Sequence, residues 1–193
     1  MNFLKLKVQI IEYLRYNLSP DLYYHNLDHT LEVLKNVKEI SQHLNISKHE
    51  LGLLKIAALF HDSGFVKSYN DHETKSCEIA KDFLLDYNVN NFDLEIIYGL
   101  IEATRIPQNP KSEIEKVIAD ADLMYLGTDR FLGIGNQLFE ELKIYTGLSS
   151  RNHWNIIQKD FLERHEFHTD YCLEKYGPKK NENLMMVIKM IKI

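Results

Sequence analysis

The chain has few of the residues that cross-link or interrupt a protein fold. Its 193 residues include two cysteines, four prolines and eight glycines. Cys77 and Cys172 lie far apart and form no CxxC pair, so nothing indicates a disulfide-stapled secreted domain, and a reducing cytoplasm is the expected location. The glycines are too scattered to form a loop that cradles a phosphate, and there is no low-complexity tract.

Long apolar runs and an excess of positive charge are also absent. No stretch approaches the roughly 18 consecutive apolar residues that a membrane span needs. The segment up to Tyr16 places lysines and acids among apolar residues at helical spacing, which predicts a helix and not a signal peptide. The net charge of −5 gives no broad basic field. We therefore expect neither a membrane nor duplex nucleic acid as a partner, although a local phosphate site stays open.

Apolar residues at helical spacing, by contrast, are plentiful. A content of 45% hydrophobic and 26% charged residues is that of an ordinary globular protein, and the length is that of one domain. The apolar period is close to 3.6 almost everywhere, and the alternation typical of strands is missing. We expect an all-α helical bundle of roughly eight to ten helices, with residues 1–193 forming a single domain.

Capping residues predict where several helices begin and end. Asn26 is a good N-cap for a helix that runs to about residue 44. A Ser-Lys-His-Glu capping box at 47–50 opens the next helix, whose body is nearly all apolar and which Gly64 should stop. Near the C-terminus, the pair at 177–178, Gly-Pro, predicts that a helix ends there and that another follows.

Two aspartates follow one another closely on a helix that Ser112 is expected to cap. Asp122 shares a face with Ile118 and other core residues. Asp120 lies about 200° away around the helix axis, on the face that carries Lys116. This separation favours Asp122 over Asp120 as an inward-facing group.

Histidine and aspartate gather in two short segments. His25 and His29 are four residues apart, so both rings can face one side of a helix start. His61 and Asp62 are adjacent at the end of a buried helix, and both reach one ion only if the ion lies beyond that end. An aspartate at the edge of a core needs a partner, and a cation is an effective one. Mixed imidazole and carboxylate groups suit Zn, Fe, Mn and similar ions.

The order, spacing and context of three segments resemble the HD-domain superfamily of metal-dependent phosphohydrolases. The segments are Tyr24–Thr30, with a YHNxxH element, the His61–Asp62 dyad at a helix end, and Ala119–Leu123, with aspartate before leucine. The resemblance covers residues 24–127, just over half of the chain. It implies an all-α bundle of the HD-domain type that holds a metal.

The resemblance implies four ligands for one divalent ion: His29, His61, Asp62 and Asp122. The ion is left open among Mn, Fe, Mg, Co, Ni and Zn. Two residues would act in catalysis: Asp62 would receive a proton from water, and His25 would donate one to the leaving oxygen as a general acid. One ion is expected because Thr104 stands about where some family members have another histidine.

The resemblance also implies a small phosphorylated substrate, and a nucleotide is the one that we expect. The chain lacks the GYP element of cyclic-dinucleotide phosphodiesterases and the synthetase motifs of stringent-response members. Lys67, His72 and Arg105 are candidate substrate contacts because they lie near the site in the sequence. The two basic residues also fit a solvated surface, and His72 also fits a helix cap.

Two other functions fit the same scaffold. A sensor module would bind metal and nucleotide without turnover, but it would need no proton donor such as His25. An iron oxygenase would hold two irons, and the absence of a histidine at Thr104 argues against it. The sequence leaves a homodimer open.

Overall fold

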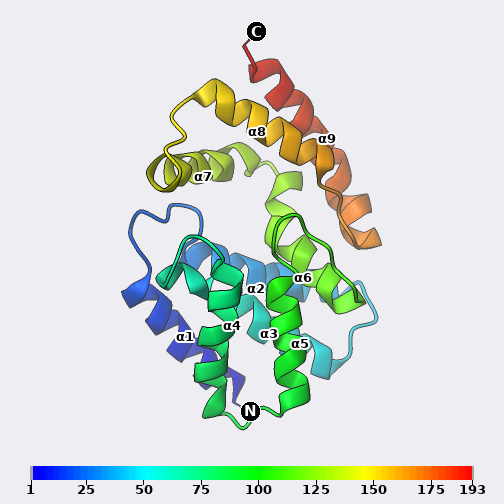
Figure 1. The fold of residues 1–193 in the computed structure, drawn as a ribbon. Helices are drawn as coiled ribbons and strands as arrows, with labels where there is room; N and C mark the ends of the chain where they lie inside the picture. Colours follow the sequence, from blue (N-terminus) through cyan, green and yellow to red (C-terminus); the bar gives the residue numbers. More distant parts are fainter. Residues whose placement is uncertain (1, 193) are drawn as a thin grey trace.

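The computed structural model describes residues 2–192, and within this range the chain forms helices and no strands (Figure 1), which confirms the all-α prediction. The elements in chain order are α1 (Phe3–Asn17), α2 (Leu27–Ser41), α3 (Lys48–Phe60), the 3₁₀-helix η1 (Ser63–Val66), α4 (His72–Leu85), α5 (Asn91–Glu102), α6 (Glu113–Leu123), the 3₁₀-helix η2 (Met124–Gly127), α7 (Phe131–Tyr145), α8 (Arg151–Arg164) and α9 (Asp170–Met190). None of these helices is long and apolar enough to cross a bilayer.

Helices α1 to α6 form a bundle, and α7 to α9 lie together at one end of it (Figure 1). Helix α3 packs against α2, α5 and α6, and its side chains from Ile56 to Phe60 are almost fully buried. This burial explains the nearly all-apolar sequence of α3. A second, smaller apolar cluster joins η2 to α7, α8 and α9 through Leu126, Phe131, Leu162 and Val187.

The N-caps follow the sequence. The side chain of Asn26 accepts hydrogen bonds from the backbone N–H groups of Asp28 and His29. The capping box at 47–50 is complete, and Ser112 caps α6. The N-cap of α2 thereby fixes the first turn in which His29 lies. Helix α2 ends at Ser41, a few residues earlier than expected.

The prediction that Gly64 terminates α3 is wrong. Helix α3 ends at Phe60, and Gly64 lies within η1, which packs tightly on the start of α4. A Cβ atom on Gly64 would lie 1.9 Å from the carbonyl oxygen of His72 and 2.8 Å from the backbone nitrogen of Ser76. Close packing of two backbones, and not a helix stop, therefore requires glycine here.

Ser76 of α4 holds the turn between α3 and η1 in place. Its hydroxyl accepts a hydrogen bond from the backbone N–H of Gly64 at 2.8 Å and donates one to the carbonyl of His61 at 2.6 Å. Ser76 is fully buried. Because His61 and Asp62 lie on this turn, Ser76 helps to fix their directions.

The predicted helix end at Gly177-Pro178 is also wrong, because α9 runs without interruption from Asp170 to Met190 with Pro178 inside it. A proline within a helix removes one hydrogen bond and costs about 3 kcal/mol. Packing on both sides of Pro178 offsets this cost: Cys172 and Val187 are buried, and Lys180 donates to the backbone carbonyl of Leu162. Tertiary contacts here outweigh local propensity.

Replacing Gly64 by alanine should destabilise the fold, because the new methyl group would collide with the backbone of α4. Forced overpacking of this kind lowers the free energy of unfolding by about 1–3 kcal/mol. Chemical denaturation of purified protein measures the change.

Gly52→Ala is the matched control. Gly52 lies in α3 with open space around its Cβ position, so alanine should raise the free energy of unfolding by about 0.5–1 kcal/mol. Equal effects of the two substitutions would contradict the account of Gly64.

Candidate metal centre

Four side chains meet at a point where one helix begins and two others end. His29 comes from the first turn of α2, His61 and Asp62 follow α3, and Asp122 lies in the last turn of α6. The Nε2 atom of His29 lies 3.0 Å from Asp122 Oδ1, 3.3 Å from Asp62 Oδ2 and 3.2 Å from His61 Nε2. The Nε2 atom of His61 lies 3.2 Å from Asp62 Oδ2 and 3.6 Å from Asp122 Oδ1. The ligands predicted from the sequence therefore converge.

These distances are those between neighbouring ligands of one ion. Two neighbouring ligand atoms that each lie about 2.0–2.2 Å from a metal in tetrahedral or octahedral geometry are about 2.8–3.6 Å apart. Ligand atoms of His29, His61 and Asp122 all lie within 4.8 Å of one another. Asp62 Oδ2 adds a fourth ligand atom, close to both imidazoles.

The hydrogen bonds around the centre also fit a cation. His61 Nδ1 lies 3.0 Å from the carbonyl oxygen of Ala58, which can only accept, so this nitrogen carries the proton. In the neutral ring, Nε2 then directs a lone pair at the centre. Asp62 Oδ2 is buried and accepts no hydrogen bond. A lone pair and an unsatisfied carboxylate oxygen that face each other call for a positive charge between them.

The pKa shifts of the cluster also indicate that a positive charge is needed between the ligand atoms. Burial lowers the pKa of His29, but the adjacent carboxylates of Asp122 and Asp62 outweigh burial and raise it to about 10. Burial raises the pKa of the Asp62 carboxyl, yet the nearby His61 and His29 hold it well below its usual range. In the protein without metal, a proton on His29 thus supplies the positive charge that an ion would supply.

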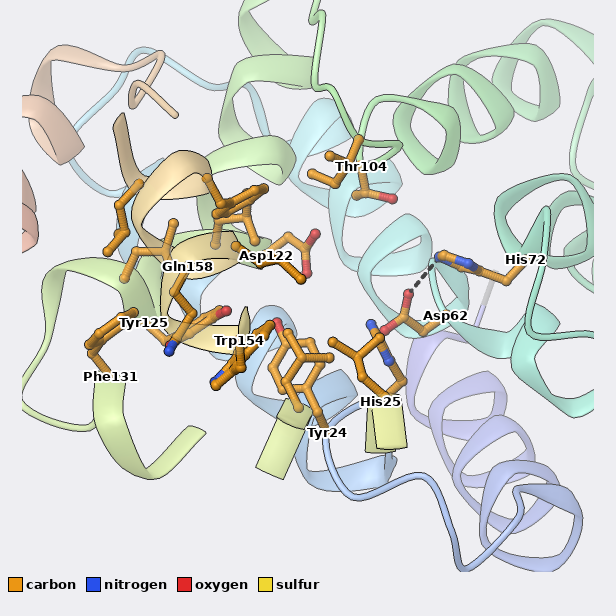
Figure 2. A pocket seen from close by; sticks show the side chains of 18 of the residues that line it. Tyr24, His25, Asp62, His72, Thr104, Asp122, Tyr125, Phe131, Trp154 and Gln158 are labelled. Atoms are coloured by element: carbon orange, nitrogen blue, oxygen red, sulfur yellow. Dashed lines mark ion pairs between the residues drawn. The ribbon is translucent and has the colours of Figure 1, made fainter. Parts of the chain in front are cut away.

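The second oxygen of Asp62 faces His72 at the start of α4. Asp62 Oδ1 lies 3.5 Å from His72 Nε2, the pair drawn as a dashed line in Figure 2. His72 Nε2 also lies 3.6 Å from Glu73 Oε1. Burial lowers the pKa of His72 in spite of these two acids. His72 therefore lies beside the ligand cluster and contacts it through Asp62.

Asp120 has a different role from Asp122. Its carboxylate is fully buried and accepts hydrogen bonds from the backbone N–H groups of His168 and Thr169, both at 2.8 Å, and from the Thr169 hydroxyl at 2.6 Å. Burial raises its pKa, although these donors oppose the shift. The two carboxylates point to different parts of the molecule, as their helix positions predict. The expectation that Asp122 and not Asp120 faces inward is wrong, because Asp120 is fully buried and fixes the start of α9, whereas Asp122 is partly exposed.

His25 lies just before α2 and is held by a residue far away in the sequence. Glu141 of α7 is fully buried and hydrogen-bonds to His25 Nδ1 through one carboxylate oxygen. Its other oxygen accepts from the backbone N–H groups of Tyr24, at 2.9 Å, and His25, at 3.1 Å. Burial raises the pKa of Glu141, but the bond from His25 and these N–H groups lower it below its usual value.

Glu141 was not found by sequence reasoning. It belongs to no motif. One signal was available: Glu141 shares a helix face with Leu138, Leu142 and Tyr145 at helical spacing. A single acid on an otherwise apolar face predicts a buried partner.

A cavity of about 340 Å³ adjoins the centre. Tyr24, His25, Asp62, His72, Thr104 and Asp122 line it on the side of the ligand cluster, as Figure 2 shows. Thr104 has no free donor, because its hydroxyl donates to the carbonyl of Ile101. The cavity thus exposes Asp62 and Asp122 to a bound molecule and places His25 and His72 beside them.

The two basic residues expected near the substrate lie elsewhere. Lys67 pairs with Glu78 at 3.4 Å, and Arg105 pairs with Glu102 at 2.9 Å and with Glu73 at 3.3 Å. Neither lines the cavity, whereas His72 does. Lys67 and Arg105 are close to the ligands in the sequence, but their side chains form ion pairs with acids and do not reach the centre.

Comparison with known families gives one match. The family model described as HD domain matches residues 26–124, just over half of the chain. The match includes all four candidate ligands; His25 lies immediately before it and Glu141 beyond it. No curated protein and no solved structure matches the chain.

Asp62→Ala and Asp122→Ala should each reduce affinity for a divalent ion by at least about tenfold, because each removes a ligand oxygen. Isothermal titration with Mn²⁺ and metal analysis of the purified variants measure the loss. Asp120→Ala is the control: it should retain metal while the free energy of unfolding falls by about 1–3 kcal/mol, since buried N–H groups lose their acceptor. If Asp120→Ala lost the metal and Asp122→Ala kept it, Asp120 would be the ligand and Asp122 would not.

Metal binding at pH 7 should release at least one proton. The raised pKa of His29, about 10, means that His29 is protonated at pH 7 and must lose this proton to bind an ion. The apparent affinity should therefore rise about tenfold per pH unit between pH 6 and pH 9. Titration calorimetry in buffers of different ionisation enthalpy counts the protons, and heats that do not depend on the buffer would contradict protonation of His29.

Proposed function

The chain belongs to the HD-domain family, and from this premise we propose that it is a metal-dependent phosphohydrolase acting on a small phosphoester. The observation that supports this most strongly is the convergence of His29, His61, Asp62 and Asp122 at the edge of a cavity that also contains His25. We propose one divalent ion, in keeping with Thr104 in place of a further histidine.

The reaction forms a bond between a water oxygen and phosphorus and breaks the bond to the leaving oxygen. A bound divalent ion lowers the pKa of water and polarises a phosphoryl oxygen. Asp62 is suited to accept the proton that water loses, because its Oδ1 faces the cavity side where His72 lies. The leaving oxygen needs a proton from a second group.

His25 is the group in position to supply that proton. The bond to Glu141 holds Nδ1 and leaves Nε2 free to act in the cavity. The ring also stacks on Phe65, with centroids 4.2 Å apart, which limits its rotation. Glu141 is thus a positioning residue that orients His25, as an acid next to a catalytic histidine does.

We also propose that residues 1–193 work as one unit. The ligand cluster lies in the segment that matches the family, whereas Glu141 and half of the cavity wall come from α7, α8 and η2. A nucleotide, the substrate expected from the sequence, is one member of the class of small phosphoesters that the centre suits.

The test is turnover by wild type and by His25→Ala, with Mn, Mg, Fe, Co, Ni and Zn supplied separately. Wild type should hydrolyse phosphoesters with at least one ion. With a poor leaving group, His25→Ala should lose about 10²–10⁴-fold in kcat, the usual contribution of general acid catalysis. With p-nitrophenyl phosphate the loss should be much smaller, because that leaving group needs little protonation.

Glu141→Gln is the companion variant and should lower kcat more than it raises KM, because it disturbs His25 and not substrate binding. Both variants should keep their metal. Equal losses with good and poor leaving groups would remove His25 from the acid role. Metal binding by wild type without turnover of any phosphoester would instead favour a sensor.

A further inference from the structure

The cavity beside the centre has two chemically different ends. Asp62, His72 and Asp122 lie at one end, while Tyr125 and Phe131 lie at the other, as Figure 2 shows. All three carboxylates that line the cavity, Asp62, Glu73 and Asp122, belong to the first end. A molecule that fills the whole cavity must therefore be polar on one side only.

The far end is built almost entirely of hydrocarbon. Half of the lining residues follow residue 124, and most of them are aliphatic or aromatic, among them Leu138, Leu142, Trp154, Ile157, Phe161 and Leu162. Gln158 and the Tyr125 hydroxyl are the polar exceptions besides the indole nitrogen of Trp154. An apolar wall of this kind favours ligand groups that leave water readily.

Positive charge is scarce around the cavity. Over residues 2–192 no lysine or arginine lines it. Lys67 pairs with Glu78 outside the cavity, and Arg105, also outside it, is neutralised by Glu102 and by the lining residue Glu73. One phosphoryl group can be neutralised by the ion and the nearby imidazoles. A di- or triphosphate would bring further charges towards a wall that has no cation to meet them.

We propose that the substrate is the monophosphate ester of an apolar alcohol or phenol, whose hydrocarbon part lies against the wall formed by α7 and α8. This inference rests on the proposed phosphohydrolase function and narrows its substrate class. Hydrolysis adds water across the ester: the P–O bond to the alcohol breaks, the alcohol oxygen takes a proton, and inorganic phosphate remains. A nucleoside monophosphate fits less well, since its ribose and base carry many polar atoms and the far end offers few partners.

A series of substrates that differ only in chain length tests the proposal. We expect kcat/KM to rise about four- to tenfold per methylene from methyl to butyl phosphate, because each added methylene is buried against the wall. Glycerol phosphate and adenosine monophosphate should be poorer substrates than butyl phosphate. A preference for either of the polar esters would overturn the proposal.

Two variants of α7 test whether the dependence on chain length arises at the apolar wall. Leu142→Gln makes the wall polar and should flatten the dependence of kcat/KM on chain length. Ile144→Gln is the matched control, because Ile144 lies two residues further along α7, is 50% exposed and does not line the cavity. If Leu142→Gln does not fold, Ile157→Gln on α8 replaces it, since Ile157 lines the cavity and is 38% exposed. Equal behaviour of the wall variant and the control would overturn the assignment.

Binding separates this proposal from the proposed reaction. Alkylphosphonates carry a P–C bond and are not hydrolysed, so calorimetry with the metal-loaded protein measures recognition alone. Hexylphosphonate should bind more tightly than methylphosphonate, and Leu142→Gln should remove the difference. If this holds while no phosphoester is hydrolysed, the pocket assignment stands and the reaction is wrong. If phosphonate affinity does not depend on chain length, the pocket assignment is wrong even where phosphoesters are hydrolysed.

Discussion

Two imidazole nitrogens 3.2 Å apart that face buried carboxylate oxygens form the constraint on which this structure depends. Without a cation, the cluster needs a proton on His29, and one oxygen of Asp62 has no donor. The surrounding elements keep the cluster together despite this cost. Ser76 fixes the turn after α3, and Asn36 donates to the carbonyl of Ala121 at 2.9 Å, next to Asp122. The fold thus holds the ligand atoms ready for an ion.

The residues of the candidate site come from two regions of the chain. The region that matches the family contributes the four candidate ligands, and the helices beyond it contribute Glu141 and the apolar wall. Glu141 connects these two regions, because it forms hydrogen bonds with both the side chain and the backbone of His25. In this account the bundle supplies the reactive centre, while α7 and α8 orient the proton donor and select the substrate.

Local patterns predicted what depends on local physics. The N-cap at Asn26, the capping box at 47–50 and the opposite directions of Asp120 and Asp122 follow from hydrogen bonding and helix periodicity. Features set by distant contacts could not be predicted in this way. Gly64 is required by close packing against the backbone of α4, and Pro178 is tolerated because α9 is packed on both sides of it. Glu141 contacts His25, which lies 116 residues away in the sequence. Nearness in the sequence was a poor guide to substrate contacts, since arginine and lysine side chains reach the nearest acid first.

The metal centre that we propose holds one divalent ion between His29, His61, Asp62 and Asp122, with His25 beside the ion and not bound to it. Anomalous diffraction from crystals grown with Mn²⁺ tests this most directly. We expect one anomalous peak within about 2.0–2.4 Å of the two Nε2 atoms and of an oxygen from each aspartate, with His25 still bonded to Glu141. A peak coordinated by His25, or by His72 in place of His29, would contradict it.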